Sequence, residues 1–324
     1  MNGRSASPTR ALVSGGAGFI GSHLCASLLE SGIDVLCVDN LLTGSTRNIA
    51  ALRGRPGFTF IEADVTTPLD VPRVDLIYHL ASPASVPLYM RYALQTLRVN
   101  SQGTWALLEL AQRHGARFLF TSTSEIYGNP LEHPQRETYW GNVNPAGPRS
   151  CYDESKRFGE SLVMQYHRSE GLDARVVRIF NTYGPHSQPD DGRVVPNFVT
   201  QALRGEPLTV YGDGSQTRSF CYVSDLVAGL RATMESPSAA GEVFNLGNPD
   251  EYTISQFADV INHLCGSRGG VIYKDLPVDD PERRRPDITK ARTLLGWSPQ
   301  VDLEPGLRAT VEWFRSLTPT TTTA

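Results

Sequence analysis

The chain has 324 residues, of which 40% are hydrophobic and 20% are charged. This mix is typical of a soluble globular protein and argues against a chain that is mainly disordered. Thirty Lys and Arg against 34 Asp and Glu give a formal net charge of −4, so we expect no nucleic-acid partner. No apolar run is long enough for a membrane span, and the first residues lack an apolar signal core, so we expect a cytoplasmic protein without a membrane partner.

The five cysteines stand far apart, at positions 25, 37, 151, 221 and 265. The sequence contains neither a C-x-x-C pair nor an H-E-x-x-H motif. It therefore predicts no disulfide framework and no metal site, and reduced thiols are the default in the cytoplasm.

Short apolar segments alternate with helical patterns over the first part of the chain. The patterns predict strands at 10–14, 34–39, 58–61, 74–80, 117–122 and 174–180, and helices at 22–31, 88–114 and 152–171. Strands that alternate with helices form βαβ units. The fold class is therefore expected to be α/β, with a Rossmann-type, doubly wound parallel sheet and helices on both faces.

The character of the chain changes after Gly184-Pro185, where the segments shorten and Pro and Gly become frequent. We expect a first domain over residues 10–184 and mainly a smaller α/β lobe over 185–316. One strand, near 243–247, is expected to return to the first domain. Residues 1–9 and 318–324 are small, polar or repetitive and are expected to be disordered.

A glycine motif, Gly15-x-x-Gly18-x-x-Gly21, lies between the first strand and the first helix. In a dinucleotide site, such glycines allow a tight turn, a close approach of the backbone to the pyrophosphate, and close packing of helix on strand. The N–H groups of the helix N-terminus then face the negative charge. Glycines also gather in ordinary loops, so the motif is specific only in this context.

Asp39 ends the second strand, 18 residues after Gly21. A carboxylate at this place accepts hydrogen bonds from the adenosine ribose and repels a 2′-phosphate, which favours NAD over NADP. The alternative is an Asp that caps a turn. Asp64 follows the third strand and is a weaker candidate for contact with the adenine, because Asp is common at strand ends.

Tyr152 and Lys156 are four residues apart, so their side chains lie on one face of a helix. An unperturbed Tyr, with a pKa of about 10, is a poor base at neutral pH, and a nearby ammonium and a cationic nicotinamide favour the phenolate. Any amphipathic helix carries such pairs. Its place after the fifth strand of a dinucleotide fold makes this pair a candidate proton-transfer site, and the hydroxyl residues at 121–124 are candidates to share its proton network.

Together, the Gly15 motif, Thr123, Tyr152 and Lys156 resemble the extended short-chain dehydrogenase/reductases that act on nucleotide sugars. Within that superfamily the chain resembles the UDP-glucuronate decarboxylase family most closely. The segments that carry this resemblance are HLASPAS (79–85), STSEIYG (122–128), CYDESKR (151–157), RIFNTYGP (178–185), DGRVVPNF (191–198), LTVYGDGSQTRSFCYVSDL (208–226), NLGNP (245–249) and DDPERRRPDI (279–288).

Two positions separate the near relatives. The related 4,6-dehydratases carry T-D-E where this chain has Thr123-Ser124-Glu125, and the related 4-epimerases have small or hydroxyl residues at the position of Glu125. Glu125 without the preceding Asp matches the decarboxylases, as does Arg284, which they place near the sugar carboxylate. Without the resemblance, Arg284 would be part of a solvated charge run.

The resemblance implies the catalytic residues Thr123, Glu125, Tyr152, Lys156 and Arg284. The implied NAD-binding residues follow the glycine turn and the strand ends: Gly15, Gly18, Phe19, Ile20, Gly21, Asp39, Asn40, Thr43, Gly44, Asp64, Val65, Leu80, Ala81, Tyr152 and Lys156. The implied substrate-binding residues come mainly from the smaller lobe and the loop after the fourth strand: Pro83, Ser85, Asn181, Val195, Tyr211, Gln216, Arg218 and Arg284.

The resemblance also implies an activity. The expected reaction is NAD-dependent decarboxylation of UDP-glucuronate to UDP-xylose, through oxidation at C4, loss of CO2 and re-reduction, by a homodimer. The alternatives are a UDP-glucuronate 4-epimerase and a decarboxylase that releases the UDP-4-keto-pentose. A non-catalytic NAD-binding regulator is a remote alternative, because fold does not determine function.

Overall fold

The main sheet has seven parallel strands. The computed structural model describes residues 9–189, 191–276, 281 and 283–317, and its main sheet has the order β11-β6-β5-β4-β1-β2-β3. The strands are β1 (Arg10–Ser14), β2 (Asp34–Asp39), β3 (Phe58–Glu62), β4 (Leu76–His79), β5 (Arg117–Thr123), β6 (Ala174–Ile179) and β11 (Val243–Leu246). The expected doubly wound α/β fold is confirmed. The expected disorder at 1–9 and 318–324 lies, apart from Thr9, outside the described residues.

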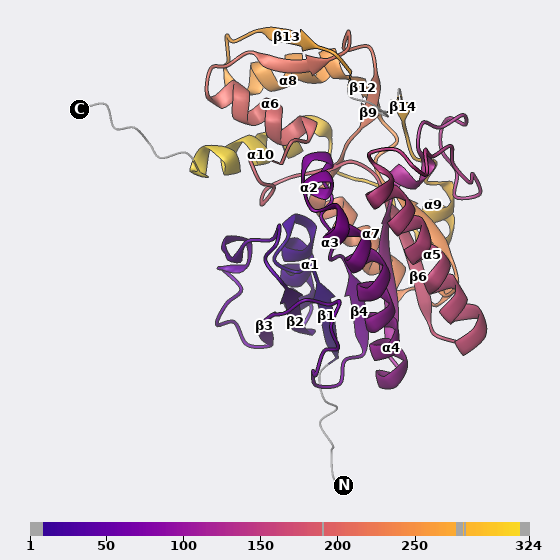
Figure 1. The fold of residues 1–324 in the computed structure, drawn as a ribbon. Coiled ribbons are helices and arrows are strands. Elements are labelled where there is room, and N and C mark those ends of the chain that lie inside the picture. Colours follow the sequence, from indigo (N-terminus) through magenta and orange to yellow (C-terminus); the bar gives the residue numbers. More distant parts are fainter. Residues whose placement is uncertain (1–8, 190, 277–280, 282, 318–324) are drawn as a thin grey trace.

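Helices cover both faces of this sheet (Figure 1). On one face lie α1 (Phe19–Glu30), α7 (Val223–Glu235) and α9 (Thr289–Leu295), which share a core with the sheet through side chains such as Leu24, Leu230 and Ala291. On the other face, α4 (Thr104–His114) and α5 (Ser150–Glu170) bury residues such as Leu108 and Val163. The two cores hold the strands in place, so the carboxyl ends of the strands form a fixed edge.

The expected continuous helix at 88–114 is wrong. The segment forms α2 (Val86–Arg91), α3 (Ala93–Arg98), a π-helical turn at Val99–Gly103, and then α4. Tyr92 separates α2 from α3, because its backbone angles, φ −111° and ψ 42°, are not helical. Asn100, in the π-helical turn, is fully buried and donates hydrogen bonds to Ser82 and Ser155. This buried polar contact is the physical reason for the irregular turn, and such turns are frequent at functional sites.

The first helix begins three residues earlier than the sequence predicted. It starts at Phe19, inside the glycine motif, with Gly18 as its N-cap residue. The N–H groups of its first turn therefore open directly onto the carboxyl ends of the strands, where anions bind helix N-termini.

A second layer lies beyond the carboxyl ends of the strands and appears at the top of Figure 1. Its helices are α6 (Val194–Leu203), α8 (Ile254–Cys265) and α10 (Leu303–Leu317). Its short strands are β7 (Thr182–Tyr183), β8 (Leu208–Tyr211), β9 (Thr217–Ser219), β10 (Cys221–Tyr222), β12 (Glu251–Thr253), β13 (Val271–Lys274) and β14 (Arg283–Arg284). The helices share a core of their own, with Phe198, Phe257 and Phe314. The division into two domains at residue 184 stays a prediction.

Short 3-10 turns complete the described chain at Thr46–Ile49, Ser124–Tyr127 and Pro237–Ala239. Among the described residues, no helix combines the length and the apolar character that crossing a membrane requires.

Candidate active site

A cleft of about 540 Å³ runs along the carboxyl ends of the main-sheet strands and reaches the second layer. This volume lies in the range of small-molecule sites. Every residue that the sequence predicted for catalysis, for the cofactor or for the substrate lines this one cleft. The structure therefore brings together positions that are spread from Gly15 to Arg284. Their individual roles stay predictions.

The glycine motif forms a cradle at one end of the cleft. Gly15 has a positive φ of 73°, and a Cβ there would lie 2.7 Å from the backbone nitrogen of Ala81. A Cβ on Gly21 would overlap the carbonyl oxygen of Gly15. Only glycine fits these two places, so the backbone itself forms the surface that a ligand would meet. The N-terminus of α1 opens beside it and favours a phosphate or pyrophosphate.

Asp39 lines the same end of the cleft as the glycine motif. Its carboxylate accepts hydrogen bonds from the backbone N–H groups of Ala17, at 3.0 Å, and Leu41, at 2.8 Å. Burial raises the pKa of Asp39, and these two bonds oppose the shift. Each carboxylate oxygen has room for a further hydrogen bond. Asp64 is joined to Asn40 by a bond of 3.1 Å, so the two side chains form one edge of the cleft.

Tyr152 and Lys156 extend from α5 toward the end of β5. The Lys156 Nζ donates to the carbonyl oxygen of Thr121 at 2.8 Å, and Tyr152 is in hydrogen-bonding contact with the hydroxyl of Thr123. Burial lowers the pKa of Lys156 to about 7. Burial, and next the charge of Glu125, raise the pKa of Tyr152. In this structure the Thr123 hydroxyl and Arg193 oppose that rise, and sequence reasoning had missed Arg193.

Glu125 follows β5 and is held by residues that sequence reasoning did not identify. The hydroxyl of Tyr89, on α2, donates to the Glu125 Oε2 at 3.1 Å. In turn, the Arg149 Nε donates to the oxygen of Tyr89 at 2.9 Å. The spacing of Arg149, Tyr152 and Lys156, three and then four residues, places them on one helix face and was the signal available for Arg149. No comparable signal exists for Tyr89, whose partners are far away in the sequence.

Arg284 lies in β14, which pairs with β9 so that Arg284 stands opposite Arg218. Arg284 is buried, and its Nε has no hydrogen-bond partner among the described residues. Ser85, at the start of α2, is also buried. Its hydroxyl has no hydrogen-bond partner among the residues that the structure describes. Buried polar groups normally have partners, so both side chains point to an anionic or hydroxyl-bearing ligand in the cleft.

The remaining substrate-side candidates line the far part of the cleft. Arg218 is buried and donates to the carbonyl oxygens of Thr217 and Pro281. Gln216 donates to the carbonyl oxygen of Tyr211 at 2.6 Å, which ties the two predicted residues together. The other predicted positions here are Pro83, after β4, Asn181, after β6, and Val195, in α6.

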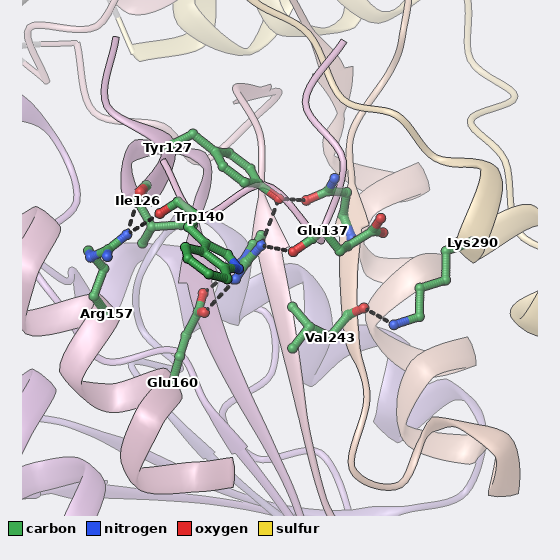
Figure 2. Close-up of polar contacts among 10 residues, drawn as sticks. Ile126, Tyr127, Glu137, Trp140, Arg157, Glu160, Val243 and Lys290 are labelled. Carbon is green, nitrogen blue, oxygen red and sulfur yellow. Dashed lines mark hydrogen bonds and ion pairs between the residues drawn. The ribbon is translucent and has the colours of Figure 1, made fainter. Parts of the chain in front are cut away.

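A polar network behind the cleft fixes the segment that follows Glu125. Arg157, on α5, donates to the carbonyl oxygens of Ile126 and Trp140, at 3.1 and 2.7 Å (Figure 2). The hydroxyl of Tyr127 donates to Asn245, on β11, at 2.8 Å.

Arg178, on β6, lies at the centre of this network. It forms two hydrogen bonds with Glu160, at 2.9 and 2.8 Å, and one each with Tyr127 and the carbonyl oxygen of Glu137. A buried charge is stable only when it is paired in this way. The network therefore anchors the loop to α5, β6 and β11, and with it the position of Glu125.

Comparisons with known proteins agree with this geometry. Residues 11–247 match the model of the NAD dependent epimerase/dehydratase family. The chain is 54% identical over 306 residues to UDP-glucuronic acid decarboxylase 1 of Xenopus tropicalis, which covers 94% of this chain and 72% of that protein. It is 52% identical over 307 residues to UDP-glucuronic acid decarboxylase 1 of Arabidopsis thaliana, and this match covers 95% of this chain and 70% of the Arabidopsis protein.

A solved structure is similar over the same length. The UDP-glucuronic acid 4-epimerase of Bacillus cereus, in complex with UDP-glucuronic acid and NAD, has a TM-score of 0.85 and 32% identity. The match covers 96% of this chain and 100% of the epimerase chain. The resemblance that the motifs indicated is thus confirmed: the chain belongs to the NAD dependent epimerase/dehydratase family and, within it, groups with the UDP-glucuronic acid decarboxylases.

Proposed function

We propose that the protein is an NAD-dependent UDP-glucuronate decarboxylase that forms UDP-xylose. The observation that carries the proposal is the meeting of Glu125 and the buried Arg284 with the Tyr152–Lys156 pair in one cleft. The Nε of Arg284 has no hydrogen-bond partner within the described part of the chain. The names of the relatives that are more than half identical to this chain support the same reaction.

The cleft fits NAD. The glycine cradle and the N-terminus of α1 would hold the pyrophosphate, Asp39 would accept hydrogen bonds from the adenosine ribose, and Lys156 would donate to the nicotinamide ribose. When bound, NAD supplies reversible oxidation of C4 of the sugar. A 2′-phosphate would meet the buried Asp39 carboxylate, so we propose NAD rather than NADP.

The chain's own residues act first on the C4 hydroxyl. Tyr152 accepts its proton as a general base, with Thr123 sharing the proton and Lys156 as the nearby cation. The need for oxidation follows from the chemistry of the substrate, since the acid alone would leave a carbanion with nowhere to place its charge. A ketone at C4 makes the substrate a β-keto acid, and departing CO2 then leaves an enolate.

The enolate oxygen is the next group that the protein must stabilise. Tyr152, now protonated, and Thr123 donate hydrogen bonds to it, as in an oxyanion site. Arg284 meets the substrate carboxylate. Glu125 has two possible tasks: repulsion of that carboxylate in the ground state, or handling of the proton that C5 takes up. Re-reduction at C4 then gives UDP-xylose.

The second layer holds the UDP part. We propose that Arg218 and Asn181 contact the diphosphate, that Tyr211 flanks the uracil with Gln216 and Val195 nearby, and that Ser85 and Pro83 contact the glucuronate. The exposed side of Tyr211 and the buried hydroxyl of Ser85 suit these two tasks.

A 4-epimerase is the second candidate function, because the Bacillus cereus 4-epimerase shares the fold and has been solved in complex with UDP-glucuronic acid. Glu125 and Arg284 favour decarboxylation over epimerisation. A decarboxylase that releases the 4-keto-pentose shares both residues and differs only in whether the reduced cofactor stays bound.

Proton NMR of the purified protein with UDP-glucuronate and NAD+ tests these readings together. We expect UDP-xylose with two protons at C5. UDP-galacturonate would establish the epimerase, and a 4-keto-pentose with accumulating reduced cofactor would remove the final reduction. An unchanged substrate, with folded protein that binds NAD, would refute the enzyme assignment and favour the regulator.

We also propose a homodimer formed across α3, α4 and α5. Leu94 on α3, Trp105 on α4 and Phe158 on α5 are large apolar side chains that are 69%, 48% and 46% exposed, and the three helices lie next to one another (Figure 1). Sedimentation should give twice the mass of the chain, and Trp105→Glu should shift it toward the monomer. A monomeric wild-type protein would refute the dimer.

A further inference from the structure

Glu125 has a second carboxyl group beside it. Asp153 lies in the first turn of α5, directly after Tyr152, and its side chain is in hydrogen-bonding contact with Glu125. Asp153 is only 7% exposed, and its Oδ1 has no hydrogen-bond partner among the described residues. Asp153 is buried while Glu125 lines the cleft. A second negative charge beside Glu125 is unfavourable at the buried member, so the pair holds a proton between its members.

The neighbours of Glu125 decide where this proton lies. Arginine has only donors, so the bond from Arg149 occupies the oxygen of Tyr89, and the Tyr89 hydroxyl must donate to Glu125. One Glu125 oxygen is therefore an acceptor. Because Asp153 is the buried member of the pair and Glu125 lines the cleft, the proton is assigned to Asp153, which donates it toward Glu125.

The other charged and titratable groups around Asp153 act in both directions. Burial, and next the charge of Glu125, raise the pKa of Asp153 well above the usual range of a carboxyl, whereas Arg284 and Arg149 lower it. Within the described chain, the titratable and charged groups that face Asp153 come from four places. They are Glu125 in the turn after β5, Tyr89 on α2, Arg149, Cys151 and Tyr152 at the start of α5, and Arg284 on β14. The balance favours the protonated form of Asp153.

We propose that Asp153 is a positioning residue that stores a proton for Glu125, and that this carboxyl pair supplies the proton taken up at C5. The inference rests on the proposed decarboxylation. When the C5–CO2 bond breaks, its electron pair stays on C5 and spreads to the C4 oxygen. The proton of Asp153 moves to Glu125, and Glu125 passes a proton to C5, where it forms the new C–H bond.

The proton balance closes with solvent. The pair gives up one proton per CO2 released and regains one from water before the next turnover. In the interval it carries one more negative charge, which Arg149 and Arg284 stabilise by their proximity. Of the two tasks left open for Glu125, the geometry points to the handling of the C5 proton.

Asp153→Asn tests the proposal, because the amide keeps the shape and a donor but has no proton to transfer. The reaction is run with NAD+ in D2O, and the product is analysed by proton NMR. The wild type should place one deuterium at C5 in a single configuration. In the variant we expect CO2 release to continue, C5 deuteration to slow on the order of 10²-fold, and both configurations to appear.

A pH profile gives a second readout. Loss of the stored proton should produce an alkaline decline in the wild-type rate that Asp153→Asn lacks, while Asp153→Glu, which keeps an acid, should restore it in part. Asp225→Asn is the matched control, since Asp225 is a buried aspartate in the first turn of α7, outside the cleft. It should leave configuration and pH profile unchanged.

The outcomes distinguish failure of the proposed function from failure of the proton store. A wild type that releases no CO2 refutes the proposed function. A wild type that decarboxylates, with Asp153→Asn giving the wild-type configuration, rate and alkaline decline, refutes the proton store alone. If Asp153→Asn does not fold, Tyr89→Phe serves instead: it removes the hydroxyl that holds Glu125 and should also mix the configurations at C5, and an unmixed product would overturn the proposal.

Discussion

Tyr89 and Tyr152 stack face to face, with ring centroids 4.7 Å apart and planes 3° from parallel. The same Tyr89 donates its hydroxyl proton to Glu125. One buried side chain thus sets the positions of two groups, the phenol that we propose acts at C4 and the carboxylate that we propose acts beside C5.

The stack leads to a first prediction. Tyr89→Leu removes the ring that supports Tyr152 and should slow oxidation at C4 by about tenfold, the equivalent of roughly 1.4 kcal/mol. Tyr89→Phe keeps the ring and should oxidise C4 at close to the wild-type rate. Single-turnover absorbance of the reduced nicotinamide measures both, and equal rates for Tyr89→Leu and the wild type would contradict the support role.

Tyr152→Phe removes the proposed base and leaves the ring in place. We expect turnover to fall by about 10²- to 10⁴-fold, while NAD still binds because the glycine cradle and Asp39 are unchanged. Product formation by NMR and calorimetric titration with NAD measure the two effects. Retained turnover would remove Tyr152 from its proposed role.

Glu125→Gln separates the steps of the reaction. The amide keeps the size of the side chain but neither repels the substrate carboxylate nor carries its proton, so C4 should still be oxidised while the later steps slow on the order of 10²-fold. Rapid-quench measurement of CO2 and of the 4-keto species follows these steps. CO2 release and C5 protonation at wild-type rates would count against Glu125 as a catalytic residue.

Gly21→Ala should fail structurally, since the added Cβ would overlap the Gly15 carbonyl oxygen. Either α1 or the turn must move, and we expect both a lower melting temperature and loss of NAD affinity. Gly266→Ala is the matched control: its φ of 66° costs about 1 kcal/mol, but nothing lies near the new Cβ. It should melt earlier and still bind NAD.

Lys156 makes the stability of the nucleotide-free protein depend on pH. Burial lowers its pKa from 10.5 to about 7, so above pH 7 the unfolded chain binds a proton that the folded chain does not. Stability from this group therefore rises with pH between these two values, by up to about 1.4 kcal/mol per unit. Urea unfolding at several pH values should show a smaller rise for Lys156→Met, and equal slopes would contradict the shift.

Much of the fold follows from local patterns. The strands that alternate with helices and the glycines between Ser14 and Ser22 have signals within a few residues, so their places were predictable. The π-helical turn at Val99–Gly103 was not, because the burial of Asn100 depends on Ser82 and Ser155, which other parts of the chain supply. A periodic pattern cannot register that contact.

The site was predictable to a similar degree. Residues in recognisable motifs were found to line the cleft together. The missed ones act through partners that are distant in sequence: Tyr89 meets Arg149 and Glu125 only after α2, α5 and the end of β5 have packed. Asp153 directly follows Tyr152 in the sequence, but its proposed role depends on Glu125, which is distant in the sequence and becomes a neighbour only in the folded chain.

The place of β11 has a consequence for synthesis on the ribosome. This strand pairs with β6 in parallel, from Val243 to Leu246. It also carries Asn245, which accepts a hydrogen bond from the Tyr127 hydroxyl. Until these residues emerge, a nascent chain exposes the outer edge of β6 and lacks one anchor of the loop behind Glu125. The main sheet therefore completes its folding only after much of the second layer has been translated. A chain stalled in that interval presents an open strand edge to chaperones.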